Sequence, residues 1–179
     1  MRKINAVISA AIMVLFVIHG TMGAMTLLGV GHINFKYLAW VMAGLIAVHT
    51  LIGIILTAKT LAVCKKTGAP YFKENSLFWA RRISGLAVML FVFFHVNAFS
   101  YTTYGVYRLK FFGIGKLISQ FGLLASAAVH IITNTRPMLI ALGVKKLRPR
   151  AGDILLFLSI MLAVMALAFV IYCIRWNFL

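Results

Sequence analysis

Carboxylates are nearly missing from this sequence. Glu74 and Asp153 are the only acidic residues among 179, whereas lysine and arginine number 18 and bring the formal net charge to +16. Neither acid lies inside a long apolar run. Buried carboxylates are a common way to move protons through a membrane protein. We therefore do not expect a glutamate-based proton route across a membrane in this chain.

Charge is scarce altogether, because 11% of the residues are charged and 63% are hydrophobic. Soluble domains are about half apolar and about a quarter charged. A chain this short has no core large enough for that excess, so its solvent must be lipid. The basic residues punctuate apolar runs and form no single basic face, which indicates membrane topology and membrane lipids as partners, and no nucleic acid.

Five stretches contain no lysine, arginine, aspartate or glutamate. They are residues 4–35, 37–58, 83–107, 117–135 and 154–174. Each is long enough to cross a bilayer as a helix of about 17–25 residues, and helices satisfy their own backbone in lipid. The sequence predicts an all-α, integral membrane bundle in a single domain, 1–179. The predicted helices are approximately 5–30, 37–59, 80–104, 115–136 and 153–175.

Proline and cysteine are also rare. Pro70, Pro137 and Pro149 are expected in the connections, because proline disrupts a helix interior. Cys64 lies in an inner connection and Cys173 near the outer end of the last helix, and no C-x-x-C or C-x-x-C-H motif occurs. An iron–sulfur cluster or a covalently attached haem in this chain is therefore not expected.

The basic residues divide unevenly between the two ends of the predicted bundle. With the N-terminus inside, thirteen lie at the inner end and five at the outer end. The inner set is Arg2, Lys3, Lys59, Lys65, Lys66, Lys73, Arg81, Arg82, Arg136, Lys145, Lys146, Arg148 and Arg150, and the outer set is Lys36, Arg108, Lys110, Lys116 and Arg175. The positive-inside rule favours a cytoplasmic N-terminus and an outer C-terminus, for a multi-pass protein of the inner (cytoplasmic) membrane. A basic inner surface suits anionic lipid headgroups, a docked partner subunit, or both.

Histidine, in contrast, is placed regularly. His19, His49, His95 and His130 lie one in each of the first four predicted helices, and His32 lies in a short outer turn. Ionisable groups inside a membrane are costly and face the bundle interior. One such histidine alone often bonds only a neighbouring helix, but a set of four spread over four helices indicates a function.

Depth sorts these four residues into two levels. At 1.5 Å per residue from the inner boundary, His19 lies about 24 Å deep and His95 about 20 Å. His49 lies about 15 Å deep and His130 about 9 Å. The sequence therefore predicts an outer pair, His19 with His95, and an inner pair, His49 with His130.

Two imidazoles at one depth suit haem b. A haem needs two axial ligands, because the porphyrin supplies four nitrogens, and it is a large apolar disc. Structural zinc usually takes four nitrogen or sulfur ligands, and no cysteine or carboxylate lies nearby to complete them. We expect two haem b groups, with His19 and His95 on the outer iron and His49 and His130 on the inner iron.

Residues near the histidines suggest how the haems are held. Gly23 and Gly53 each follow a histidine by four residues, where a small residue lets a macrocycle approach. Arg81 and Arg136, at the inner edge, are expected to contact haem propionates. The candidates for accepting the second N–H of an imidazole are Thr26, Thr50 and Thr133.

The helix order and the one-histidine-per-helix layout resemble the dihaem cytochrome b membrane anchor of succinate:quinone oxidoreductases, including fumarate reductases with a single five-helix anchor. The stretch RRISG ahead of His95, with Arg82, Ser84 and Gly85, is similar to the R-x-[ST]-G start of that helix in the family. The segment HIITNTRPMLIALG, which starts at His130, resembles the family's exit from its fourth helix. The family pairs its histidines in the same way, first with third and second with fourth.

This resemblance implies a role in electron transfer. The chain would hold both haems and pass electrons between a quinone, menaquinone or ubiquinone, and soluble subunits. Those partners are a flavoprotein with FAD, which carries the dicarboxylate site, and an iron–sulfur subunit on the cytoplasmic face. Arg82 and Ser84 are similar to quinone-contacting residues of related anchors.

Two other functions remain open from the sequence. The first is a dihaem cytochrome b of another quinone-linked enzyme, such as a hydrogenase, a formate dehydrogenase or a cytochrome b561-like reductase. The second is a protein without haem, a membrane anchor or transporter component whose histidines bond neighbouring helices. A reduced-minus-oxidised spectrum separates the haem proteins from the last class.

Overall fold

The computed structural model describes residues 1–30, 36–68, 75–104 and 106–178. Within these residues it contains five long helices and one short antiparallel hairpin. The helices are α1 (Arg2–Leu28), α2 (Lys36–Thr67), α4 (Ser76–Val96), α5 (Ile114–Ala141) and α6 (Leu147–Asn177), and the strands are β1 (Ser100–Thr103) and β2 (Val106–Leu109). All five helices are long and apolar enough to cross a membrane, which confirms the predicted all-α bundle.

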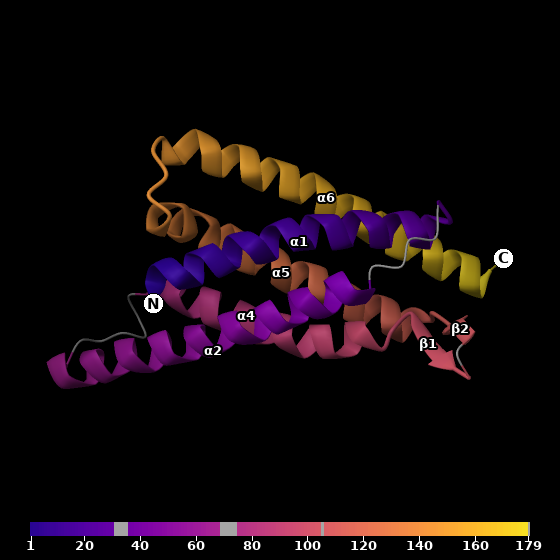
Figure 1. The fold of residues 1–179 in the computed structure, drawn as a ribbon, viewed down its shortest axis with the longest axis horizontal. Coiled ribbons are helices and arrows are strands. Elements are labelled where there is room, and N and C mark those ends of the chain that lie inside the picture. Colours follow the sequence, from indigo (N-terminus) through magenta and orange to yellow (C-terminus); the bar gives the residue numbers. More distant parts are fainter. Residues whose placement is uncertain (31–35, 69–74, 105, 179) are drawn as a thin grey trace.

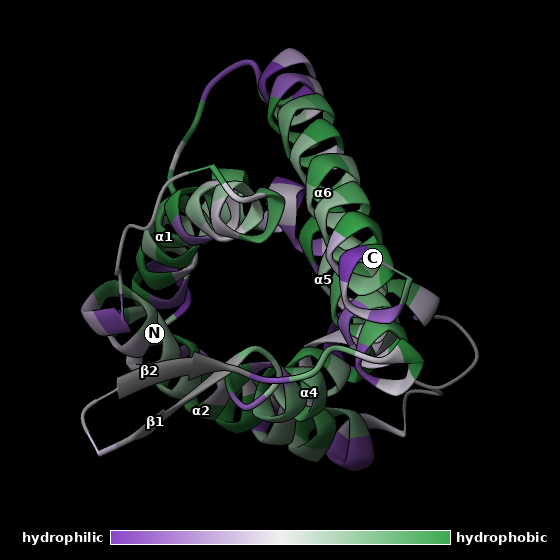
Figure 2. Ribbon diagram, turned by 90° about the vertical axis from the view of Figure 1, so that its right-hand side faces the viewer, coloured by the Kyte–Doolittle hydropathy of each residue, from purple (hydrophilic) through white to green (hydrophobic). Residues whose placement is uncertain are grey.

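Successive helices run in opposite directions along the bundle, so the N- and C-termini lie at opposite ends (Figure 1). Seen along the bundle, α1, α2, α4 and α5 surround its long axis (Figure 2). The most extensive helix contact joins α4 to α5, and α6 packs against both α1 and α5. The four helices that carry the predicted ligands therefore face one another, with α6 outside them.

The third helix is shorter than predicted. The prediction that it runs to residue 104 was wrong, because α4 ends at Val96 and the chain turns into the hairpin of β1 and β2. Ser100 pairs with Leu109 and Thr103 with Val106 in this hairpin. Tyrosine, threonine and valine favour strands. Because these segments are uncharged up to Arg108, the absence of charge alone predicted a helix here.

Two prolines lie inside helices, which corrects the expectation that all three fall in connections. Pro149 is in the first turn of α6, where a missing N–H breaks no helical hydrogen bond. Pro137 is inside α5, which continues to Ala141 and not to about 136 as predicted. Pro70 lies outside the described residues.

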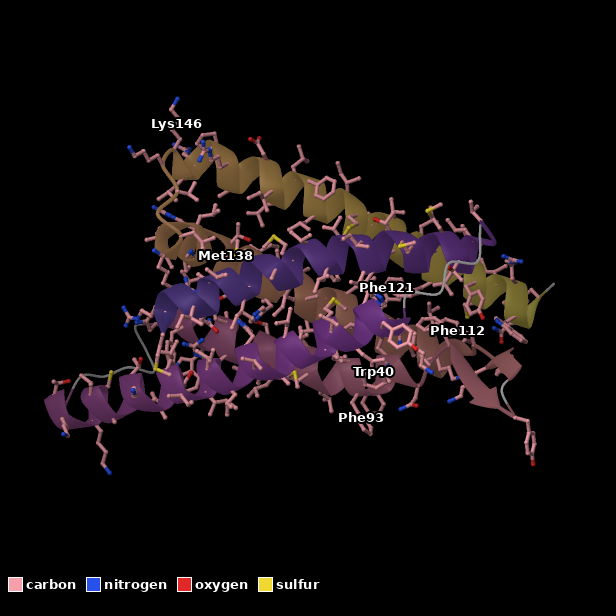
Figure 3. The ribbon with its side chains drawn as sticks, viewed as in Figure 1. Trp40, Phe93, Phe112, Phe121, Met138 and Lys146 are labelled. Atoms are coloured by element: carbon pink, nitrogen blue, oxygen red, sulfur yellow. The ribbon has the colours of Figure 1, made fainter. Side chains whose placement is uncertain are left out.

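Apolar side chains cover the outside of the bundle. Phe93 is 69% exposed and points away from α4 (Figure 3), and Trp40 on α2 is 57% exposed. The buried core is small and lies among α1, α5 and α6, with one cluster around Ala168 and Phe112 and another around Met138. None of the residues of α2 is buried. This distribution suits a protein whose outer surface meets lipid.

Gly122 permits the close contact between α4 and α5. A Cβ atom placed on Gly122 overlaps the ring of Phe91. We therefore expect Gly122→Ala to destabilise the bundle by about 1–3 kcal/mol through overpacking, measured by unfolding in detergent. Phe91→Leu should restore part of the loss. The control is Gly115→Ala in the same helix, where nothing lies within 4 Å of the added Cβ.

Candidate functional site

The four membrane histidines meet in two pairs. His19 on α1 faces His95 on α4, with ring centroids 5.9 Å apart and planes at 72°. His49 on α2 faces His130 on α5, with ring centroids 6.1 Å apart and planes at 89°. These are the two pairs that depth along the helices predicts. His32 lies outside the described residues.

The separation of the rings matches two imidazoles on one metal. A metal–imidazole nitrogen bond is about 2 Å long, and the nitrogen lies about 1 Å from the ring centre, so two rings on opposite sides of one ion have centres about 6 Å apart. Both observed separations, 5.9 and 6.1 Å, have this value. Within the described residues no cluster of three or more histidine, cysteine or acidic side chains forms. Each site thus offers two imidazoles.

A serine on the neighbouring helix holds the ring of His49. Ser9 Oγ lies 3.2 Å from His49 Nδ1 and donates its hydrogen to the carbonyl of Asn5 at 2.8 Å. A hydroxyl has one hydrogen to donate. When Ser9 donates to the Asn5 carbonyl, it accepts from the imidazole, so the proton of neutral His49 is then on Nδ1 and Nε2 has the lone pair.

His130 has the same arrangement. Ser84, which is 5% exposed, lies with its Oγ 3.2 Å from His130 Nδ1 and donates to the carbonyl of Arg81 at 3.3 Å. Asn134 Nδ2 approaches the same ring nitrogen at 3.5 Å, but its shorter bond, at 2.8 Å, goes to the His130 carbonyl. When Ser84 donates to the Arg81 carbonyl, His130 donates from Nδ1 and keeps its Nε2 lone pair, as His49 does with Ser9.

Gln120 holds the ring of His95 at the outer pair. Its Oε1 lies 2.7 Å from His95 Nδ1, its Nε2 donates to Ser119 Oγ at 3.1 Å, and the side chain is completely buried. Because the amide nitrogen has its own acceptor, Oε1 is the end that accepts from the imidazole. His95 thus also presents Nε2 as a lone pair.

Small residues leave room beside the rings. A Cβ on Gly85 would come within 3.1 Å of His130 Cε1, so any larger residue would push this ring away by a few tenths of an ångström. At Gly23 and Gly53, one turn beyond His19 and His49, no atom lies within 4 Å of an added Cβ. The ligand faces of α1 and α2 are therefore open at these positions, which fits a flat group beside each ring.

The three arginines predicted near the inner site have different surroundings. Arg81 Nε donates to the carbonyl of Thr133 at 2.9 Å. The guanidinium carbon of Arg82 lies 4.9 Å from the centre of the Phe78 ring, and its charge acts on His49 and His130. Arg136 is exposed on α5. Arg81 thus lies next to the turn that follows His130, and Arg136 is exposed at the same end of the bundle.

The predicted threonine acceptors do not hold the histidines. Thr26 donates to the carbonyl of Met22 in its own helix, and Thr133 likewise bonds within its own helix. No hydrogen bond among the described residues joins Thr50 to one of the four rings. A threonine hydroxyl in a membrane helix donates to the carbonyl one turn earlier in the same helix. The sequence distance from a histidine therefore does not show which hydroxyl faces its ring.

Two of the three observed acceptors, Ser9 and Gln120, were missed. Ser9 is 40 residues from His49 in sequence and carries no local signal. Gln120 did have one, because it is the only glutamine in the chain and lies within an uncharged run. An amide in such a run needs a buried partner. The sequence does predict a role for Ser84, but as a quinone contact and not as a partner of His130.

Comparisons with protein-family models, with curated proteins and with solved structures find no match for this chain. Its function is therefore argued from the two histidine pairs and their hydrogen bonds.

Removing the amide of Gln120 should leave the N–H of His95 without an acceptor. We expect Gln120→Met, which keeps the length of the side chain, to lower the free energy of unfolding by about 1–3 kcal/mol. Unfolding in detergent measures this loss. In a His95→Leu background the same substitution should cost much less, since no donor is then left without a partner. An equal loss in both backgrounds would mean that Gln120 contributes by packing alone.

Proposed function

We propose that this chain is the dihaem cytochrome b subunit of a membrane-bound quinone oxidoreductase of the succinate dehydrogenase and fumarate reductase type. His19 and His95 bind the outer haem iron, and His49 and His130 bind the inner one. The chain passes electrons between quinone or quinol and soluble subunits, and it carries no dicarboxylate site of its own.

The observation that carries this proposal is the pairing of the rings, with centroids 5.9 Å apart in the outer pair and 6.1 Å apart in the inner pair. In the inner pair each Nδ1 also lies 3.2 Å from a serine hydroxyl, and a ring that donates to this serine keeps its Nε2 lone pair. A direct hydrogen bond between two histidines needs one N–H and one lone pair. Two lone pairs in one pair of rings instead match a metal that takes both. This favours a metal-binding pair over histidines that only join helices.

Haem b fits these sites better than a bare metal ion. Each pair would supply two nitrogens to the iron, and the porphyrin would supply the other four. Gly23 and Gly53 leave open space one turn from His19 and His49, which suits a macrocycle. When bound, haem supplies one-electron redox chemistry. The residues of the chain hold the ligand rings, fix their tautomers and exclude water.

Aromatic rings pack beside His95 at the outer pair. The ring of Phe99 lies 5.4 Å from that of His95 and stacks on Phe112 at 5.1 Å and on Phe169 at 5.7 Å. These rings join α4, α6 and the segment before α5 into one aromatic cluster. An apolar shell of this kind would influence the reduction potential of an iron bound there.

Arginines at the inner end of the bundle are proposed to make the polar contacts of the haems and the quinone. Arg81 and Arg136 are expected to contact haem propionates, and Arg82 with Ser84 the quinone. A guanidinium has five N–H donors, of which the bond from Arg81 to Thr133 uses one. Since Ser84 already bonds His130, a quinone at this end would share its hydroxyl.

The basic end of the bundle supports the proposed orientation and partners. The basic residues around the N-terminus, the end of α2 and the start of α6 lie together at one end, where α2 projects beyond the N-terminus (Figure 1). We propose that this end faces the cytoplasm at the inner membrane, meets anionic lipids, and docks the iron–sulfur subunit with its FAD-containing flavoprotein.

Removing ligands one at a time tests the pairing of the haems. His19→Ala and His95→Ala should each halve the haem content and remove the same b-type band from the reduced-minus-oxidised spectrum. His49→Ala and His130→Ala should remove the other band, and the His19→Ala/His49→Ala double variant both. His32→Ala is the control and should keep both haems. A colourless wild-type protein refutes the haem proposal, and loss of different haems from His19→Ala and His95→Ala refutes the pairing.

Gentle extraction tests the proposed enzyme class. Purified through a tag on this chain in mild detergent, the protein should bring with it one subunit containing flavin and one containing iron–sulfur clusters, with succinate- or fumarate-dependent turnover. Recovery of both haems with a hydrogenase or formate dehydrogenase subunit instead would keep the cytochrome and reject the class.

A further inference from the structure

Pro137 opens a gap in the hydrogen bonding of α5. In a regular α-helix the N–H of residue 137 would donate to the carbonyl of Thr133, four residues earlier. Proline has no N–H, and its ring pushes against that carbonyl. Pro137 lies inside α5, four residues before its end. The carbonyl of Thr133 therefore needs a donor from outside its own helix, since a bare carbonyl in lipid costs several kcal/mol.

Arg81 of α4 supplies that donor. Its Nε–H bonds the carbonyl of Thr133 at 2.9 Å, a length typical of a good N–H···O bond. The hydroxyl of Thr133 does not replace it, because that group donates to carbonyls of its own helix. A cationic residue at the inner end of α4 thus completes the backbone of α5.

The same face of α4 makes two more contacts with this part of α5. Ser84, three residues after Arg81, has its Oγ 3.2 Å from His130 Nδ1. Gly85, four residues after Arg81, lets the His130 ring come within 3.3 Å of its Cβ position at Nδ1. Residues at i, i+3 and i+4 share one helix face. One face of α4 therefore contacts the turn from His130 to Thr133 in three places. Gly85 contacts the His130 ring, Ser84 contacts its Nδ1 atom, and Arg81 contacts the carbonyl of Thr133.

We propose that Arg81 is the positioning residue for His130, and that Pro137 is its counterpart, because it leaves the carbonyl of Thr133 for Arg81 to bind. Without this bond, the turn that follows His130 loses its attachment to α4 and the ring can rotate away from Ser84. The inference deepens the proposed function, on which its haem readout rests. It assigns Arg81 a role through its Nε–H donor, distinct from charge pairing with a propionate.

A double-variant cycle separates these two roles. The four proteins are wild type, Arg81→Met, Pro137→Ala and the combined variant. Arg81→Met alone should lower the equilibrium constant for folding about ten- to a hundredfold, since it strands a carbonyl in an apolar environment. In the Pro137→Ala background the same substitution should change this constant by less than about threefold, because the alanine restores the backbone N–H that donates to Thr133. Unfolding of the haem-free chain in detergent measures both values.

The ferric spectrum of the inner haem gives the second readout. The electron paramagnetic resonance signal of a bis-histidine haem depends on the angle between its imidazole planes. Arg81→Met should shift the signal that disappears in His130→Ala, leave the signal that depends on His95 unchanged, and lose its effect in the Pro137→Ala background. Arg150→Met, which removes an exposed charge at the same end of the bundle, is the matched control.

Arg81→Gln decides between donor and charge. Glutamine keeps N–H donors without the charge, so this variant should retain most of the stability and the signal if Arg81 acts on the Thr133 carbonyl. Equal effects of Arg81→Met in both backgrounds, or a loss in Arg81→Gln as large as in Arg81→Met, overturn the proposal. If Arg81→Met folds only together with Pro137→Ala, the coupling is supported. A haem-free wild type that still shows the coupling rejects the haem proposal and keeps the contact.

Discussion

Polar groups inside a hydrocarbon solvent must find partners within the protein, and this constraint accounts for most of the specific contacts in the bundle. The Nδ1 atoms of His49, His95 and His130 each lie within hydrogen-bond distance of a side chain of another helix. The backbone follows the same rule, since Arg81 completes the carbonyl left open by proline. The polar contacts therefore fix the positions of the apolar helices relative to one another.

The two histidine pairs use this constraint in different ways. The inner pair lies with one nitrogen of each ring 3.2 Å from a serine hydroxyl. In the outer pair His95 lies 2.7 Å from the amide of Gln120, near stacked aromatic rings. The two pairs thus have different polar neighbours. Hydrogen bonds to a ligand ring, nearby charge and burial are the means by which proteins tune bound metals.

Packing is concentrated away from the inner histidines. The buried apolar clusters join α1, α5 and α6, whereas α2 has no buried residue and packs mainly against α1. The helix that carries His49 is therefore held less by apolar contact than the others. A group bound between α2 and α5 would add contacts where the apolar packing is sparsest, so we expect ligand binding and the stability of this side of the bundle to be coupled.

The periodic absence of charge predicted most of the architecture, because lipid requires long uncharged helices whatever their partners. The pairing of His19 with His95 and of His49 with His130 also followed from sequence, since depth in a membrane is proportional to residue number. The predicted helix ends were wrong after Val96, where β-forming residues follow an apolar run, and at Pro137, which is tolerated within α5. They were also wrong where a helix continues through basic residues, since α2 extends past 59 to Thr67 and α6 begins at Leu147 and not at 153. The absence of charge marks the apolar span and not the end of the helix.

By itself, the sequence determined the solvent, the helix class and the level of each histidine, because these depend on composition and on position along one helix. Tertiary structure alone decided which side chains orient the rings: Ser9, Ser84 and Gln120 are distant in sequence from the histidines they bind. It also decided that Arg81 meets the carbonyl of Thr133. Such contacts depend on the rotation and crossing of neighbouring helices, which side-chain packing sets and no local pattern records.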